Sequence, residues 1–226
     1  MKGRREPFGR ETGSNPTEVF MAAFDSLDRY RARYGYRDFY DALVLLHRSV
    51  ARLIANRMRP RIDGKFVERL MLAVTEVNGC AVCSWAHTGI ALKKGFAQAE
   101  IDAFLSGSGA YVVPGEATAI LFAQHYAGTQ GRPERQAWEA LVQEYGAERA
   151  RLILAAIQVM MVGNISGLPL SALLARLKGR PYARSSVLFE LGMQLAGVIF
   201  LPVTALHALL CRATARANIR FAEEPA

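Results

Sequence analysis

The sequence predicts an all-α fold, and two observations lead to that prediction. Apolar residues recur at the three- and four-residue spacing of amphipathic helices in one segment after another, and glycine, proline and an Asn-Gly pair separate these segments. The chain of 226 residues has 51% hydrophobic and 21% charged residues, which is the composition of a globular protein with a substantial core. We therefore expect a bundle of packed helices.

The N-terminal region begins with a basic tail. Residues 1–16 are charged and contain no apolar run, so we expect a disordered tail and no secretory signal peptide. A helix is predicted to follow, with Thr17 as its cap and apolar positions as far as Leu27. Another helix is predicted over residues 39–56. Three cysteines are too few for a disulfide framework, which favours a cytoplasmic location.

A belt of basic residues overlaps these helices. Nine arginines lie between residues 29 and 61, where Asp38 and Asp41 are the acidic neighbours. With a net charge of +8, this pattern makes nucleic acid and an anionic membrane candidate partners. No recognised nucleic-acid-binding motif is present. We therefore favour a solvated face with salt bridges between subunits, and nucleic acid is not the expected partner.

The segment over residues 68–87, ERLMLAVTEVNGCAVCSWAH, concentrates the chemistry of the chain. A helix is predicted to end at Asn78 and Gly79, because this pair tolerates left-handed backbone. A new helix then opens with Cys80, and Cys83 lies in its first turn. The unsatisfied N–H groups there, together with the positive end of the helix dipole, stabilise a thiolate and lower its pKa.

Helical geometry predicts which side chains of this segment meet. Cys80, Cys83 and His87 are three and four residues apart, so they share one face of the helix. If the two helices fold back antiparallel at the break, Glu68 and His87 stand at about the same height above the turn. The carboxylate can then orient the imidazole and raise its basicity, and the imidazole can exchange protons with the cysteine pair.

The spacing Glu-x11-Cys-x2-Cys-x3-His, with Asn-Gly before the first cysteine, resembles the alkylhydroperoxidase D-like branch of the carboxymuconolactone decarboxylase family. The resemblance covers residues 39–178 and is strongest over residues 66–95. It implies a helical bundle of the alkylhydroperoxidase D-like type that reduces hydroperoxides through a CxxC disulfide. Members of the decarboxylase branch proper generally lack this cysteine pair, which favours redox chemistry.

The resemblance also implies a role for each residue of the motif. Cys83 is the thiol that peroxide oxidises to sulfenic acid, and Cys80 is its proton donor and resolving partner. Glu68 and His87 form the proton relay. A dithiol reductant, such as a thioredoxin-like or lipoyl-type protein, resets the disulfide, and no flavin, haem or metal cofactor is expected. Well-known members have a histidine next to the second cysteine, where this chain has Val82.

Other interpretations of the motif stay open. Cys80, Cys83 and His87 could supply three zinc ligands, although no second Cys/His pair is present to complete a site. The two cysteines could also be inert buried residues. Glu76 is an alternative carboxylate, but it shares a helical stripe with basic residues, so we favour Glu68.

Two further functions also remain open. The chain could be a redox sensor or thiol-transfer protein that uses the same disulfide without efficient peroxide turnover. It could instead be a carboxymuconolactone decarboxylase-like acid/base enzyme in which the cysteines are incidental.

The segments after the motif continue the helical pattern. The motif helix is predicted to end at Lys93 and Lys94, with Gly95 as the stop. A short helix over residues 98–105 and a flexible Ser-Gly loop over residues 106–109 are predicted to follow.

The second half of the chain contains three more predicted helices. Two of them cover residues 116–126 and 133–145, and Gly146 ends the second. Residues 152–175 then run without a formal charge, long enough for a membrane candidate by hydropathy alone. Polar residues and Pro169 interrupt this run, and the resemblance implies a buried helix of a soluble bundle.

Residues 191–211 form a second uncharged segment that is long enough to span a membrane. Pro202 and His207 count against a span. Three alternatives stay open: a membrane anchor, a helix buried between subunits, and a helix on a lipid surface. His207 and Cys211 are four residues apart, and we expect them to be packing residues. Basic residues flank the segment on both sides, namely Arg180, Arg184, Arg212, Arg216 and Arg220.

These observations divide the chain into three parts. We expect residues 1–16 to be a disordered basic tail and residues 17–180 to be the alkylhydroperoxidase D-like helical domain. Residues 181–226 are expected to hold the added apolar helix and a polar tail. The expected assembly is a homo-oligomer in the cytoplasm, with a membrane contact through residues 191–211 as the open alternative.

Overall fold

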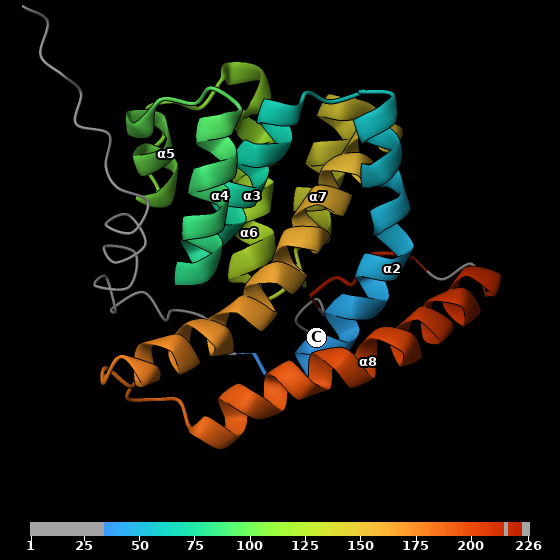
Figure 1. Cartoon of the computed structure of the whole chain (residues 1–226). Helices are drawn as coiled ribbons and strands as arrows, with labels where there is room; N and C mark the ends of the chain where they lie inside the picture. Colours follow the sequence, from blue (N-terminus) through green and yellow to red (C-terminus); the bar gives the residue numbers. More distant parts are fainter. Residues whose placement is uncertain (1–33, 215–216, 223–226) are drawn as a thin grey trace, which may run out of the picture.

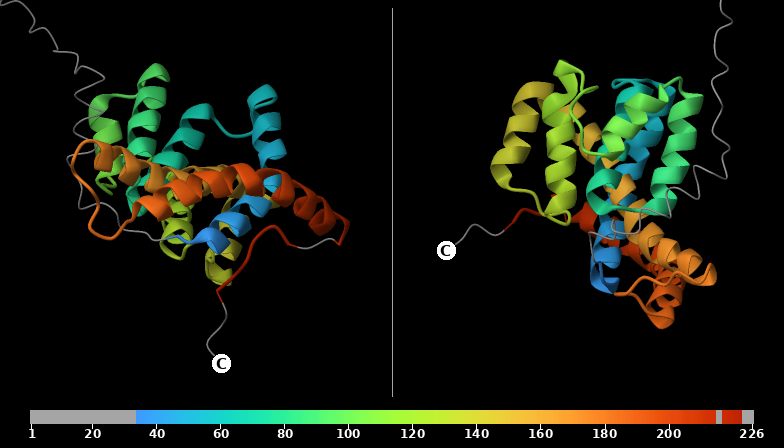
Figure 2. Two further views of the ribbon diagram at one scale, coloured as in Figure 1. Left: turned by 60° about the horizontal axis from the view of Figure 1, so that its bottom comes forward. Right: turned by 90° about the vertical axis from the view of Figure 1, so that its left-hand side faces the viewer.

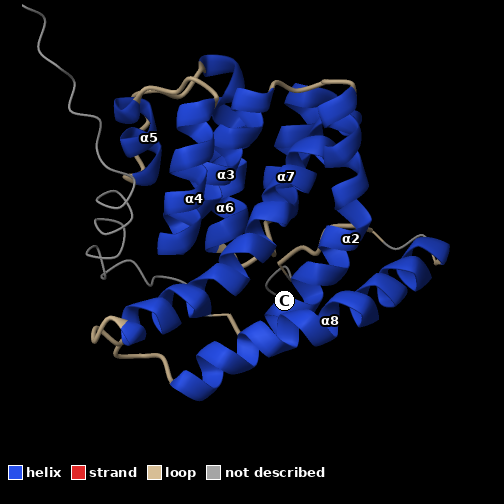
Figure 3. Cartoon of the chain, in the orientation of Figure 1, coloured by secondary structure: helices blue, strands red, loops and turns tan. Residues whose placement is uncertain are grey.

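The computed structural model describes residues 34–214 and 217–222. All the regular secondary structure in these residues is helical, which confirms the predicted all-α class (Figures 1 and 3). The predicted tail over residues 1–16, the helix from Thr17 to Leu27 and the first three arginines of the basic belt lie outside the described residues. The helices are α2 (Tyr36–Met58), α3 (Gly64–Asn78), α4 (Ala81–Lys93), α5 (Gln98–Leu105), the 3-10 helix η2 (Pro114–Glu116), α6 (Ala117–Gly128), α7 (Arg135–Leu177) and α8 (Val187–Ala213).

Helix α7 is the centre of the fold. It contacts α2, α3, α4, α6 and α8, and Figure 1 shows it crossing the molecule between α3 on one side and α2 on the other. The uncharged run over residues 152–175 lies in this helix, and its most apolar window is 78% buried. The prediction of a buried bundle helix for this run is therefore confirmed. Its core side chains include Leu152, Ile153, Leu154, Ile157, Met160, Met161, Ile165 and Leu168.

The predicted break at Gly146 is present within α7. Gly146 has φ 73° and ψ 157°, so two helical stretches meet at a kink in what is otherwise a continuous element. Glycine is required there because side chains disfavour this region of backbone space. The kink lets the second stretch, from residue 147 onward, pass through the core while the first stretch packs beside α6.

Helix α8 packs along one side of the molecule against α2 and α7, as both views of Figure 2 show. Its buried Glu190 pairs with Arg176, with an N–O distance of 2.8 Å. Further along, the Tyr40 hydroxyl lies 3.1 Å from Nδ1 of His207. Cys211 is buried in a small cluster with Ala208 of α8 and Val44 of α2. His207 and Cys211 are therefore packing residues, as predicted.

In the part of the chain that the structure describes, two helices are long and apolar enough to cross a membrane, judged by length and composition alone. These are α7 and α8, and the most apolar window of α8 is only 22% buried, in contrast to that of α7. The two helices thus have different surroundings despite similar hydropathy. Helix α7 is a core element, whereas α8 leaves one side exposed.

Candidate functional site

The turn between α3 and α4 creates the hairpin that carries the site. Gly79 adopts left-handed backbone with φ 70° and ψ 32°, and its N–H donates to the carbonyl of Thr75. The buried side chain of Asn78 accepts a hydrogen bond of 2.6 Å from the Tyr34 hydroxyl. The predicted Asn-Gly break is therefore present, and a contact with the start of α2 holds it in place.

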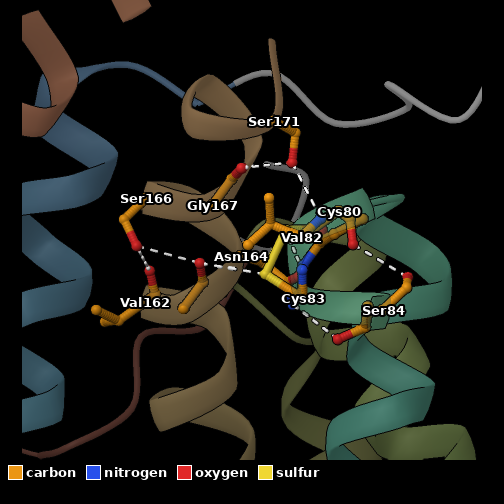
Figure 4. The surroundings of a disulfide bond; sticks show 12 residues. Cys80, Val82, Cys83, Ser84, Val162, Asn164, Ser166, Gly167 and Ser171 are labelled. Carbon is orange, nitrogen blue, oxygen red and sulfur yellow. Dashed lines mark hydrogen bonds between the residues drawn. A yellow bond between two sulfur atoms is a disulfide. The ribbon is translucent and has the colours of Figure 1, made fainter. Parts of the chain in front are cut away.

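The two cysteines lie at the beginning of α4. Cys80 is the N-cap residue and Cys83 lies in the first turn, and their sulfurs are joined in a disulfide (Figure 4). The backbone N–H of Cys83 points at Sγ of Cys80, with a distance of 3.3 Å. The N–H of Val82 donates to Oγ of Ser171 on α7. At the start of α4, the N–H of Cys83 therefore contacts the Cys80 sulfur, and the N–H of Val82 joins α4 to α7.

The sulfurs face a strip of small residues on α7. Gly163 places its carbonyl oxygen 3.4 Å from Sγ of Cys83. A Cβ atom at Gly167 would lie only 2.6 Å from both sulfurs, so this position has no room for a side chain. Gly167 is a site residue that the sequence analysis missed, because spacing within one segment does not show which residue of a distant helix faces the cysteines.

Exposure distinguishes the two cysteine residues. Cys80 is completely buried, whereas Cys83 retains 7% of its surface. An incoming molecule therefore meets Cys83 before Cys80.

The predicted meeting of Glu68 and His87 is present in the structure. Oε1 of Glu68 lies 2.5 Å from Nδ1 of His87, on the facing sides of α3 and α4. Oε2 of the same carboxylate lies 2.6 Å from Nζ of Lys94. Glu68 is 1% exposed, so the buried carboxylate bridges a histidine and a lysine that both reach toward the surface.

Lys94 is a second residue that the sequence analysis missed. It appeared there only as a cation at the end of a helix. The signal was available, because Lys94 follows His87 by seven residues and two helical turns bring it back to the same face of α4. Lys94 also donates to the carbonyl of Gly64, 3.1 Å away. The lysine thus ties the end of α4 to the beginning of α3.

These contacts set the protonation of the array. Burial raises the pKa of Glu68, but the hydrogen bonds from His87 and Lys94 outweigh burial and hold the pKa below its ordinary value. The carboxylate is therefore ionised and can only accept hydrogen bonds. Nδ1 of His87 must carry the proton, which leaves the lone pair of Nε2 on neutral His87 available to accept another.

The alternative carboxylate, Glu76, lies elsewhere. A Cβ atom at Gly107, in the loop after α5, would be 3.3 Å from Oε1 of Glu76. Arg69, one of the basic residues on the same helical stripe, forms ion pairs with Glu100 and Glu116. Glu68 is therefore the carboxylate that contacts His87.

The zinc interpretation requires a group of metal-binding side chains. Within residues 34–214 and 217–222, no three or more His, Cys, Asp or Glu side chains are grouped so that they could hold a metal ion.

Val82, the residue next to the second cysteine, packs with Leu174 and Tyr182 around Ala81 and Ala175. The position between the cysteines thus serves the junction of α4 with α7.

The segment that contains the site matches the model of a known protein family. Residues 38–125 match the model of the Carboxymuconolactone decarboxylase family. This is the wider family whose alkylhydroperoxidase D-like branch the motif resembles, and the match covers less than half of the chain. The matched segment contains almost all of α2 and the complete array of Glu68, His87, Lys94 and the cysteine pair, whereas α7 and α8 lie beyond it. No curated protein and no solved structure matches the chain significantly.

Proposed function

We propose that this protein reduces hydroperoxides with the Cys80–Cys83 pair and regenerates the pair with an external dithiol. The observation that carries the proposal is the buried, ionised Glu68 that holds Nδ1 of His87, one helical turn after Cys83. A carboxylate-backed imidazole beside a thiol is the arrangement that activates a weak nucleophile. The match to the carboxymuconolactone decarboxylase family, which includes alkylhydroperoxidase D-like proteins, supports it.

The first step begins with the reduced pair. Nε2 of His87 takes the proton of the Cys83 thiol, and the resulting thiolate attacks the outer oxygen of the hydroperoxide. The O–O bond breaks, Cys83 becomes a sulfenic acid, and the leaving alkoxide receives a proton to become an alcohol. The peroxide is reduced by two electrons and the Cys83 sulfur is oxidised by two.

The second step forms the disulfide. The Cys80 sulfur attacks the sulfenic sulfur, the S–O bond breaks, and the departing hydroxide combines with the Cys80 proton to give water. The N–H of Cys83, which points at Sγ of Cys80, stabilises the Cys80 sulfur when it carries negative charge.

The third step resets the pair. A thiolate of the external dithiol attacks the sulfur of Cys83, the cysteine of the pair that is not completely buried, and Cys80 leaves as the thiolate stabilised at the N-cap. The second thiol of the donor then displaces Cys83 and returns both cysteines to the reduced form. We also propose a cytoplasmic location, because the cycle depends on a steady supply of dithiol, and a homo-oligomeric assembly.

Steady-state peroxide consumption with a dithiol donor tests the proposal. Cys83→Ser is expected to lower turnover by at least about 100-fold, because the attacking thiol is gone and the remaining thiol of the pair, Cys80, is completely buried. Mass spectrometry of alkylated protein before and after peroxide locates the oxidised residues. Cys211→Ser is the matched control, since Cys211 is buried on α8, and it should keep full activity.

Other results would select the alternatives. A disulfide that forms with peroxide but is not turned over by any dithiol would indicate a redox sensor. Decarboxylation of a lactone substrate that survives Cys83→Ser would indicate an acid/base enzyme. If purified protein with free thiols consumes no peroxide and both cysteines stay reduced, the proposal is wrong.

A further inference from the structure

The outer side of α8 is a continuous apolar surface. Ten apolar residues with exposed side chains lie on it within an arc of about 140°, and they span about 33 Å along the helix. No charged residue lies between Leu191 and Cys211. The members of this outer stripe are Leu188, Leu191, Leu195, Val198, Ile199, Pro202, Val203, Leu206, Leu209 and Leu210.

We propose that the outer stripe of α8 docks the protein on an anionic lipid surface, with the helix lying in the plane of the interface. The large side chains of the stripe are 49% to 84% exposed. Together they present apolar surface on the order of 1,000 Å², beyond the roughly 300–600 Å² of the largest patch on a typical monomer. A stripe of this kind marks a surface that another apolar phase covers.

The inner side of α8 argues for a helix that lies on the surface. Glu190 is fully buried and paired with Arg176, and Gln194 donates to the carbonyl of Ser166 on α7. At the other end, the guanidinium of Arg212 donates to the carbonyl of His47 on α2. Crossing a bilayer would break these polar contacts and leave a carboxylate in hydrocarbon, which is costly. Docked on the domain, α8 can bury only its outer stripe in lipid.

Charge identifies the kind of surface. Lys178, Arg180 and Arg184 are exposed before α8, and Arg212 is exposed at its end, so both ends of the stripe are cationic. Anionic headgroups match this pattern, because basic residues close to such a surface are attracted to its negative charge. A second copy of the chain fits less well. Two-fold pairing along α8 brings a cationic end of one copy against a cationic end of the other, whichever way the helices run.

Co-sedimentation of the full chain with vesicles tests the proposal. The protein should sediment with vesicles of phosphatidylcholine and phosphatidylglycerol, bind phosphatidylcholine alone at least tenfold more weakly, and be released by salt. Leu195→Gln combined with Leu206→Gln should weaken binding at least tenfold, because both side chains lie on the outer stripe. Leu121→Gln on α6 is the matched control, since Leu121 is 65% exposed outside the stripe, and it should bind like the unchanged protein.

Other outcomes would overturn the proposal. The substitutions replace exposed side chains, so circular dichroism and thermal unfolding should stay unchanged and separate lost binding from lost folding. Protein that stays in the supernatant with every vesicle, but forms dimers that Leu195→Gln with Leu206→Gln dissociates, would identify a subunit interface. Protein that resists alkaline carbonate extraction from cell membranes would identify a spanning helix. Peroxidase turnover is measured separately, so its failure leaves this test unaffected.

Discussion

A single buried carboxylate organises the candidate site at the scale of residues. Glu68 accepts hydrogen bonds from His87 on one oxygen and from Lys94 on the other. The lysine keeps the carboxylate ionised, and the ionised carboxylate fixes which nitrogen of the imidazole carries the proton. The tautomer that leaves Nε2 able to accept a proton therefore depends on both neighbours of Glu68.

The lowered pKa of Glu68 predicts how stability depends on pH. Because the folded state holds this pKa below the ordinary value of 4.5, the ionised carboxylate stabilises the fold above about pH 4.5. That contribution is lost as the pH falls through the folded-state pKa. Urea unfolding from pH 3 to pH 7 should show Glu68→Gln less stable by about 1–3 kcal/mol at neutral pH. The difference should shrink on acidification; a difference that grows toward pH 3 would contradict this account.

Lys94 is expected to act on activity through Glu68. Replacing it in Lys94→Met removes a cation 2.6 Å from the carboxylate, so the pKa of Glu68 rises. The acid limb of the pH profile for peroxide reduction should then move upward by about one pH unit. Lys94→Arg keeps the charge and should retain most of the original profile. An unshifted profile in Lys94→Met would show that the lysine serves only to join α4 to α3.

At the scale of elements, the contact between α4 and α7 decides how the cysteines are held. The start of α4 donates its Val82 amide to Ser171, and Gly163 and Gly167 let α7 approach the sulfurs. The site is therefore a junction between two helices and not a feature of the α4 turn alone.

Gly167→Ala tests this junction. The added Cβ would lie 2.6 Å from both sulfurs, so α7 or the cysteines must move. Overpacking of this kind costs about 1–3 kcal/mol, which thermal or urea unfolding would detect, and disulfide formation after peroxide should slow. Gly163→Ala is the matched control, because its Cβ would meet only the end of Met160 at an ordinary 3.5 Å. Equal stability of the two variants would argue against a close α4–α7 contact.

The sequence predicted elements well where a local rule applies. Gly79, Gly95 and Gly146 each adopt a positive φ at the predicted break, because a stop of this kind depends on one residue and its neighbours. Helical spacing likewise predicted that Glu68 and His87 stand at the same height above the turn between α3 and α4, where they are in contact. Local rules do not show which residue of a distant helix faces a motif, and so Gly167 was overlooked.

Helix boundaries show the same limit. Helix α2 begins three residues before the predicted Phe39 and ends two residues after Asn56. Its end depends on the Asn56 side chain, which accepts hydrogen bonds from the N–H groups of Arg61 and Ile62. A contact of this kind requires the following turn to be folded, which spacing within the helix cannot reveal.

At the scale of the whole molecule, α8 belongs to the fold as well as to the surface. Met193 on its inner side is fully buried in the main hydrophobic core. The segment after α8 also contributes, because Asn218 donates to Gln158 of α7. The sequence alone does not show whether α8 contacts lipid or protein, since a membrane anchor and a packed helix can have the same hydropathy.

Met193→Ala tests this role of α8. Removing a fully buried methionine side chain should cost about 2–5 kcal/mol of unfolding free energy. Leu195→Ala, two residues along on the 61% exposed outer side, should change stability by less than about 0.5 kcal/mol. Denaturant unfolding of both variants separates the two sides of the helix. Equal effects would mean that α8 is not anchored by its inner side.

The disulfide joins residues only three positions apart, within the first turn of one helix. A ring that small fastens no remote segments together, so the constraint that it imposes on the chain is confined to the start of α4. The bond can transmit its state only to the strip of α7 that lies against it. A disulfide of this kind fits the proposed peroxide reduction better than signalling, because a signal would require a structural change farther away.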